Sequence, residues 1–287
     1  MSPAAEPHVA RNAAAGQRGM ALTRASWGGR LGTVLPPLVT LALILALWQA
    51  LIIAFDLKPY LVPSPWAVLQ ALWVYRDDLW SALLATLKDA VIGLAISVVA
   101  GLLIAILITR HKLLERGLLP YATALQTIPV ISFAPLILIW MGTGDPGVIL
   151  IALIVAIFPI ISNTTMGLLS TDHNLINLAT IYNASGWQQL VKLRLPSALP
   201  YILAGVRISS GLCVIGVIVG EWYAGTGGDS GGLGFIISVT ARTNVMDELF
   251  AATLLTSALG IVVFVVVSIV SHLWLRRWHE SSLAREN

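Results

Sequence analysis

Apolar residues gather in six runs of 20 or more positions, separated by shorter polar segments. Five of the runs contain no Asp, Glu, Lys or Arg, and the remaining one contains only Arg207. About 20 apolar residues in a helix cross the hydrocarbon core of a bilayer. The pattern therefore predicts an all-α, polytopic membrane protein with six transmembrane helices, over Leu31–Phe55, Ala90–Thr109, Gly117–Met141, Gly147–Ser170, Tyr201–Gly220 and Leu249–Trp274.

The two ends of the chain are more polar than the runs. Residues 1–30 are rich in Ala, Gly and Arg and predict a mobile N-terminal tail. The run over residues 31–55 is longer than the apolar part of a signal peptide, and no A-x-A-like cleavage site follows it. We therefore expect a retained first transmembrane helix there. Residues 84–275 are expected to form the main transmembrane domain and residues 276–287 a C-terminal tail.

The loop over residues 56–83 contains a helix signal of its own. Ser64 is a favourable N-cap, and Pro65 suits the first helical position. Large apolar side chains then recur at helical spacing, at Trp66, Leu69, Leu72 and Trp73. The pattern predicts an amphipathic helix that either lies on the outer membrane surface or packs on the bundle.

Composition supports a membrane protein and excludes several other classes. Hydrophobic residues make up 57% of the 287 positions and charged residues only 11%, against about 25% charged in soluble domains. This balance excludes a disordered chain, a coiled coil and a soluble enzyme. The formal net charge is +3, but the basic residues are scattered between apolar runs, so we expect no nucleic-acid partner. Cys213 lies in an apolar run and is expected to be a small packing residue.

The distribution of Lys and Arg predicts the orientation. With the N-terminus in the cytoplasm, the cytoplasmic segments hold twelve of the 17 basic residues, and Arg207 lies within a span. The outer segments hold only Lys58, Arg76, Lys88 and Arg242. Cytoplasmic loops carry the excess of positive charge in such proteins. We therefore expect a multi-pass protein of the bacterial inner membrane with both termini in the cytoplasm.

The third run has features of a pore lining. Pro129 and Pro135 each remove a backbone donor and disturb a helix. Freed carbonyls at membrane depth are tolerated where protein or a watery cavity satisfies them. Gln126, Thr127 and Ser132 are close by and are candidates for the translocation path, although an ordinary packed kink explains the prolines equally well. Glu221, an acid at the end of the fifth run, is a further candidate.

Nucleotide-binding and enzyme motifs are missing from the sequence. The glycine-dense stretch Gly220–Gly234 contains no Lys, and no G-K-[ST] occurs anywhere, so no Walker A loop is present. These glycines are expected to form a turn before a short helix from about Phe235. The five His residues show no metal-ligand spacing, and neither H-E-x-x-H nor G-x-S-x-G occurs. We expect no catalytic residue, metal or cofactor in this chain.

The inner segment Ser170–Pro200 is the longest interior loop between spans. Its pattern predicts two short helices, over residues 175–182 and 187–195, with Asn183 between them. Asn tolerates the left-handed conformation that ends a helix. We expect Pro196 to stop the second helix and Pro200 to open the next span. Such a helix–turn–helix is a suitable docking element for a soluble partner, and Trp187 is a large aromatic contact within it.

This loop resembles the cytoplasmic loop of binding-protein-dependent ABC importer permeases. The family pattern is Glu-Ala-Ala, three residues, Gly, nine residues, Ile, one residue, Leu-Pro. Aligned on Leu195 and Pro196, the spacing fits throughout, with Ala179 and Leu193 in register. The chain departs from the pattern where Asn177 replaces Glu, Leu178 replaces Ala and Asn183 replaces Gly. Asn suits the turn, but the loss of Glu puts a specific ion pair with the ATPase in doubt.

Other stretches resemble the nitrate, sulfonate and taurine branch of that family. They are "IPVISFAPLILIWMGTGDPG", "FPIISNTTMGLLSTD", "LPSALPYILAGVRISSG" and "GGLGFIISVTARTNVMDELFAATLLTSALG". The resemblance implies a type I importer permease that works with a second permease copy, two ATPase subunits and an external solute-binding protein. ATP and Mg would be bound by the ATPase. Members of the branch carry nitrate, alkylsulfonates, taurine, bicarbonate, thiamine-precursor pyrimidines or aromatic acids.

An ion-coupled secondary transporter is the alternative function. Such proteins usually show inverted repeats and intramembrane ionisable groups. No inverted repeat is visible here, and only Arg207 lies clearly within a run. Arg207 either attracts an anionic solute or, about 10 Å along the helix from Pro200 by the 1.5 Å rise, reaches the cytoplasmic interface in a structural role.

Overall fold

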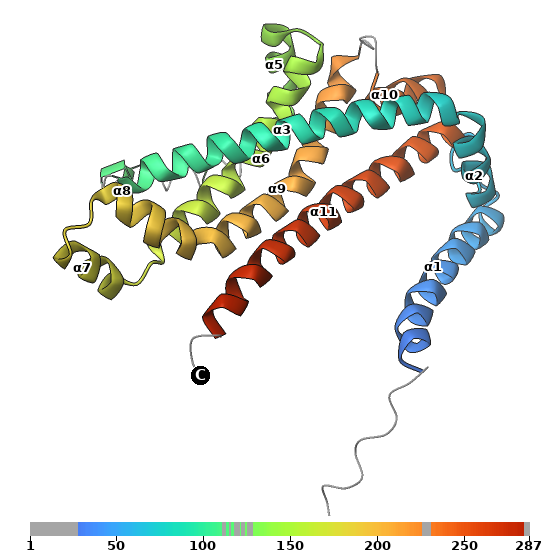
Figure 1. The fold of residues 1–287 in the computed structure, drawn as a ribbon. Coiled ribbons are helices and arrows are strands. Elements are labelled where there is room, and N and C mark those ends of the chain that lie inside the picture. The colour runs from blue at the N-terminus through green and yellow to red at the C-terminus, as the bar shows by residue number, and fades with distance from the viewer. Residues whose placement is uncertain are drawn as a thin grey trace, which may run out of the picture. The chain divides into compact units, whose positions relative to one another are not determined.

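A computed structural model describes residues 28–110, 113–114, 116–117, 121, 124, 129–225 and 231–283. Within these ranges every regular element is a helix, which confirms the all-α fold (Figure 1). The elements are α1 (Gly28–Ala54), α2 (Pro65–Val74), α3 (Arg76–Arg110), η1 (Val130–Ser132), α5 (Ala134–Met141), α6 (Asp145–Leu169), α7 (His173–Ile181), α8 (Gly186–Gln189), η2 (Leu190–Arg194), α9 (Leu195–Ala224), α10 (Leu233–Thr243) and α11 (Met246–Leu283).

The chain divides into two compact units, residues 1–57 and 58–287. The described part of the first unit is α1, whose side chains from Leu35 onward are mostly exposed and apolar. Pro36 and Pro37 lie inside α1, and the hydroxyl of Thr40 donates a 2.9 Å hydrogen bond to the Pro36 carbonyl. An exposed apolar helix of this length suits a lipid environment, as expected for the first transmembrane helix.

The second unit is built around α6 and α9, which pack along much of their length. α3 packs against α6, while α10 and α11 pack against α9. Small residues allow the close approach, as in other membrane helix pairs. A Cβ on Gly216 of α9 would lie 2.7 Å from the Ala152 Cα of α6, so only glycine fits there. Cys213 is 1% exposed and donates to the Ala90 carbonyl, as the packing role predicts.

Five described helices are long and apolar enough to cross a membrane. They lie over Leu35–Ala54, Arg76–Arg110, Asp145–Leu169, Gly186–Ala224 and Met246–Arg276, and so correspond to the first, second, fourth, fifth and sixth runs.

The third run does not form one continuous helix in its described part. Most of residues 117–128, including Gln126 and Thr127, lies outside the described residues. The remainder is divided into η1 and α5, with Pro129 before η1 and Pro135 in the first turn of α5. A proline lacks the N–H that would continue a helix, which explains the interruption.

Several helices extend beyond the predicted boundaries. α3 begins at Arg76, inside the predicted loop over residues 56–83, and Asp77 and Asp78 lie in its first turn, where acidic side chains favour a helix start. α11 continues to Leu283, past the predicted boundary at 275. The helix predicted from Ser64 and Pro65 is α2, and the Ser64 hydroxyl caps it by accepting from the Ala67 N–H at 3.1 Å.

Candidate functional site

The turn between α7 and α8 depends on a left-handed residue. Asn183 has φ 55°, which confirms the conformation predicted for it. The Ala184 N–H donates to the Ala179 carbonyl at 2.9 Å, and the Asn183 N–H donates to the Thr180 carbonyl at 3.0 Å. These two bonds form a Schellman motif, which ends α7 and redirects the chain. Two of the predicted loop residues, Ala179 and Asn183, therefore act together in one turn.

Both short helices begin with a side-chain cap. The Asp172 carboxylate accepts from the Asn174 N–H at 2.8 Å at the start of α7. Ser185 and Gln188 form a reciprocal capping box at the start of α8, through hydrogen bonds of 3.3 and 2.8 Å. Caps at both starts and a Schellman motif between them define the shape of the segment locally.

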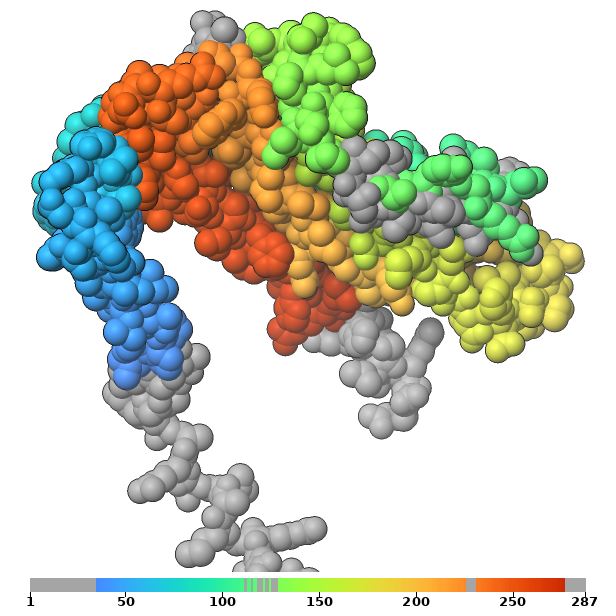
Figure 2. All heavy atoms as spheres, turned by 180° about the vertical axis from the view of Figure 1, so that it is seen from behind, coloured from blue at the N-terminus to red at the C-terminus, as the bar shows by residue number. Residues whose placement is uncertain are grey.

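The segment 173–189, which we term the α7–α8 knob, projects from one end of the second unit (Figures 1 and 2). No residue of α7 or α8 is buried. Asn177 is exposed, and so are large apolar side chains, with Trp187 64% exposed. The others are Leu175, Leu178, Ile181 and Tyr182. A cluster of exposed apolar side chains of this kind is typical of an interaction surface.

The second stretch of the loop does not end where the sequence predicted. Residues 186–224 form one continuous helical path, because the π-helical η2 joins α8 to α9. Pro196 lies in the first turn of α9, so it does not stop the preceding helix, and Pro200 lies inside α9 rather than at its start. In η2 the Leu195 N–H donates to the Leu190 carbonyl, five residues back. This wider turn accommodates the missing N–H of Pro196 without a break.

The predicted loop residues divide by exposure. Leu195 and Pro196 are half-buried, and Leu195 packs against a cluster that includes Leu168, Leu190 and Ala198. Trp187, Asn177 and Asn183 are exposed on the knob. The first group therefore anchors the knob to the bundle, and the second group is available for contact.

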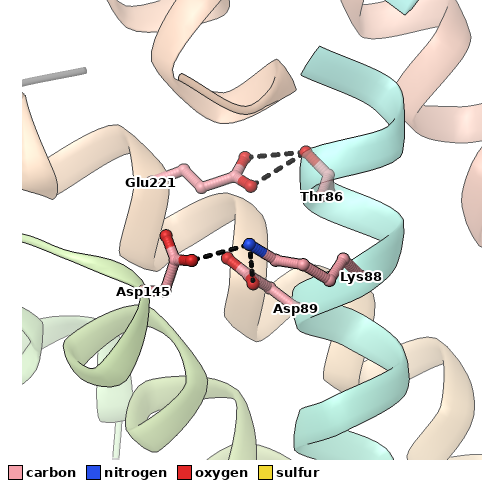
Figure 3. Close-up of polar contacts among 5 residues, drawn as sticks. All are labelled: Thr86, Lys88, Asp89, Asp145 and Glu221. Atoms are coloured by element: carbon pink, nitrogen blue, oxygen red, sulfur yellow. Dashed lines mark hydrogen bonds and ion pairs between the residues drawn. The ribbon is translucent and has the colours of Figure 1, made fainter. Parts of the chain in front are cut away.

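The opposite end of the bundle holds a polar cluster around Glu221 (Figure 3). Glu221 is 6% exposed, and its carboxylate accepts from the Thr86 hydroxyl, at 2.8 Å to Oε1 and 3.1 Å to Oε2. Oε2 also accepts from the Gly234 N–H at 2.8 Å, and the Thr86 hydroxyl accepts from the Leu233 N–H at 2.9 Å. Glu221 and Thr86 thus cap the start of α10 from two other helices. A Cβ on Gly232 would overlap the Glu221 carboxylate, so this approach requires glycine.

An ion pair lies beside this cluster. The Lys88 ammonium of α3 lies 2.6 Å from Asp145 Oδ2, in the first turn of α6, and 3.6 Å from Asp89 Oδ1. Asp89, Asp145 and Glu221 share the lining of a small polar cavity of about 30 Å³. Sequence reasoning missed Thr86, Lys88, Asp89 and Asp145. The adjacent charges at 88 and 89, directly before the second apolar run, were the available signal.

An apolar groove of about 350 Å³ lies between η1, α6 and α9. The described residues that line it are Pro129, Val130, Ile131, Ile151, Ile154, Val155, Phe158, Pro159, Leu212, Ile215, Gly216 and Val219. Ser132 is exposed next to the groove and does not line it, and Glu221 lies in the separate polar cluster. Within the described ranges, the candidates for the translocation path are therefore not brought together.

Comparison with known proteins identifies the family. The sequence profile of the family described as "Binding-protein-dependent transport system inner membrane component" matches residues 97–285. The chain belongs to this family. It is 33% identical over 240 residues to a "Probable ABC transporter permease protein" of Haemophilus influenzae, covering 83% of this chain and 96% of that protein. It is 32% identical to the riboflavin transport system permease protein RibX of Chloroflexus aurantiacus, covering 85% of this chain and 90% of that protein.

Solved structures support the fold. The crystal structure of an amino acid ABC transporter with histidines matches with a TM-score of 0.56 at 18% identity, covering 72% of this chain and 97% of that one. Further relatives, which are 34%, 29% and 27% identical to this chain, are named for formylaminopyrimidine, aliphatic sulfonate and nitrate transport, respectively. This permease is therefore a multi-pass, inner-membrane ABC transporter component with a type I importer fold, as the sequence resemblance predicted.

Proposed function

We propose that this permease forms the path of a small solute across the inner membrane. An external binding protein delivers the solute, a second permease copy completes the path, and two separate ATPase subunits drive the cycle. Family membership supports this proposal over the ion-coupled secondary transporter. The observation that carries the coupling role is the α7–α8 knob, in which no residue is buried and several large apolar side chains are exposed.

The knob is proposed to dock on the ATPase mainly through apolar contacts. Asn177 stands where the family pattern has Glu, and a neutral amide cannot form an ion pair. Trp187, Ile181 and Tyr182 offer exposed apolar area instead. Large aromatic side chains dominate the energy of many interfaces. The capped helices and the turn at Asn183 hold these side chains in one arrangement, which lowers the entropy cost of docking.

Movement of the docked knob would reach the bundle through the continuous helix from Gly186 to Ala224. Leu190 is buried against Leu168 and Ala198, so the base of the knob is joined to α6 and α9 by packing rather than by a flexible loop. A rigid connection of this kind transmits displacement to the helices that line the groove.

The apolar groove is proposed as this copy's share of the translocation path. Among the residues that the structure describes, none of the twelve that line it carries a charge or a polar side chain. Such a surface offers no electrostatic stabilisation to a small inorganic anion, and it favours a solute with an apolar or ring portion. Among the expected solutes, this favours an organic acid, an alkylsulfonate or a pyrimidine over nitrate.

The orientation is proposed from charge. Twelve Lys and Arg residues lie on the side that would carry both termini and the knob, and four lie on the other side. The positive-inside rule then puts the knob in the cytoplasm, where ATP is present, and the Thr86–Glu221 cluster toward the outside.

Co-purification with the ATPase tests the coupling role. The Trp187→Ala variant should express and insert into the membrane normally. Little of the ATPase subunit should co-purify with it, and it should transport solute poorly. Trp73→Ala is the matched control, because Trp73 is 72% exposed but lies on α2, away from the knob. The purified permease alone should not hydrolyse ATP. Solute uptake driven by a proton or sodium gradient, in liposomes that hold only this chain, would refute the proposal.

A further inference from the structure

A cavity of about 600 Å³ lies at the base of the α7–α8 knob, beside the end of α3. The described residues that line it are Ile106, Thr109, Arg110, Leu169, His173, Gly186, Gln189, Leu190 and Arg194. They come from α3, the end of α6, α7, α8 and η2. The volume is typical of a site for a small molecule or a headgroup.

The polar part of the lining is suited to an anion. Arg110, Arg194 and His173 supply N–H donors, and none of the lining residues that the structure describes is acidic. Within the part of the chain that the structure describes, neither arginine side chain makes an ion pair or a hydrogen bond. The guanidinium group stays charged at all physiological pH values and matches a phosphate with two parallel hydrogen bonds.

The other polar donors in the lining are already used. The Gln189 amide donates to the Ala184 carbonyl at 3.2 Å, and the Thr109 hydroxyl donates to the Ala105 carbonyl at 3.0 Å. The two arginines and His173 are therefore the groups left to hold a ligand.

The remaining wall is aliphatic, formed by Ile106, Leu169 and Leu190. Arg110 is the last residue of a membrane-crossing helix, and Leu107 and Leu103, about one and two turns earlier, are exposed. A charged group at the end of a span lies at the depth of the lipid headgroups. Cations next to an aliphatic wall at this depth match an amphiphilic anion better than a soluble one.

We propose that this cavity binds the phosphate of an anionic phospholipid from the cytoplasmic leaflet, such as phosphatidylglycerol. The choice of leaflet rests on the orientation given under the proposed function. Arg110 in α3 and Arg194 in η2 bind the phosphate, and the aliphatic wall contacts the start of an acyl chain. Since Gly186, Gln189 and Leu190 share the cavity, the bound lipid ties the base of the knob to α3.

Native mass spectrometry of the purified permease tests this, with dioleoylphosphatidylglycerol titrated against dioleoylphosphatidylcholine. A basic residue near the membrane surface contributes about fivefold to binding of an anionic lipid. The double variant Arg110→Gln, Arg194→Gln should therefore bind phosphatidylglycerol about 25-fold more weakly. Lys192→Gln is the matched control, because Lys192 is an exposed cation of η2 that does not line the cavity. It should bind like wild type.

The Arg110→Lys, Arg194→Lys variant keeps both charges and should recover most of the affinity. Recovery of affinity in the lysine variant would show that the glutamine variant binds weakly because it lacks the positive charges, and not because it is misfolded. Equal binding of the two lipids by wild type, or wild-type binding by the double glutamine variant, would overturn the proposal. Competition by millimolar inorganic phosphate alone would overturn the lipid source and indicate a soluble anion.

The measurement needs neither ATPase nor solute, so it can fail while the coupling role stands. If the double glutamine variant binds lipid normally but loses the ATPase, the arginines contact that protein, and the lipid proposal is wrong. If Trp187→Ala retains the ATPase while the lipid titration behaves as expected, the coupling role fails and the lipid site stands.

Discussion

The hydroxyl of Thr86 in α3 donates a 2.8 Å hydrogen bond to Glu221 Oε1 in α9, across 135 positions of sequence. The same hydroxyl accepts from the Leu233 N–H at the start of α10. The Thr86 hydroxyl therefore connects three helices, and the side chains of Thr86 and Glu221 are both buried. Glu221 was a candidate for the solute path, and here both of its oxygens accept hydrogen bonds from protein donors.

Thr86→Val should destabilise the permease, because valine has nearly the same shape but neither gives nor accepts a hydrogen bond. The buried Leu233 N–H and the Glu221 carboxylate would each lose a partner, at about 1–3 kcal/mol for an unsatisfied buried group. Thr86→Ser keeps the hydroxyl and should lose much less. Thermal unfolding in detergent compares the two. Equal melting temperatures for valine and serine would show that the hydrogen bonds contribute little.

Gly216→Ala should also destabilise the protein, through the α6–α9 contact. The added methyl would lie 2.7 Å from the Ala152 Cα, which is backbone and cannot rotate away. Overpacking of this kind costs about 1–3 kcal/mol. Gly211→Ala is the control on the same helix, because a Cβ there meets nothing within 4 Å. Alanine favours helix over glycine, so this control should be neutral or stabilising. A melting temperature that falls equally in both would point to a cause other than packing.

Local features of the fold could be predicted from sequence, and distant pairings could not. Ser64 and Pro65 predicted the start of α2, and Asn183 predicted a left-handed turn, because each signal depends on one or two neighbouring residues. The Thr86–Glu221 pair joins positions far apart, and neither residue has a local pattern that names its partner.

The error at Pro196 has a different cause. A proline normally predicts a helix end, but the π-helical turn before it lets the helix continue. No residue pattern in the sequence predicts that turn. The family could be predicted because the loop spacing and the order of the motifs in this sequence match the family pattern. The transported solute could not be predicted, because no single motif specifies it.

Cysteine labelling checks the proposed orientation. The only native cysteine, Cys213, is 1% exposed and should give little background. Asp77→Cys at the start of α3, where the side chain is 88% exposed, should react with an impermeant maleimide in intact cells. Asn177→Cys on the knob should react only after permeabilisation. Labelling of residue 177 from outside would reverse the topology and remove the knob from the ATPase side.

Substitutions of Asn183 test whether coupling depends on the left-handed turn between α7 and α8. Residue 183 has φ 55°, a region that glycine enters freely and a β-branched residue does not. Asn183→Gly should therefore keep ATPase co-purification and uptake near wild type. Asn183→Val adds a strain of about 1–2 kcal/mol to the native turn. The turn would relax by changing the angle between α7 and α8, and uptake should fall roughly five- to thirtyfold.

Membrane abundance and melting temperature should barely change in either variant, because no residue of α7 or α8 is buried and the strain can be released within the knob. This separates a coupling defect from a folding defect. A valine variant that retains the ATPase and transports like wild type would show that the knob does not need its left-handed turn. Loss of abundance in both variants would instead assign Asn183 to folding, since glycine relieves the backbone and removes only the amide side chain.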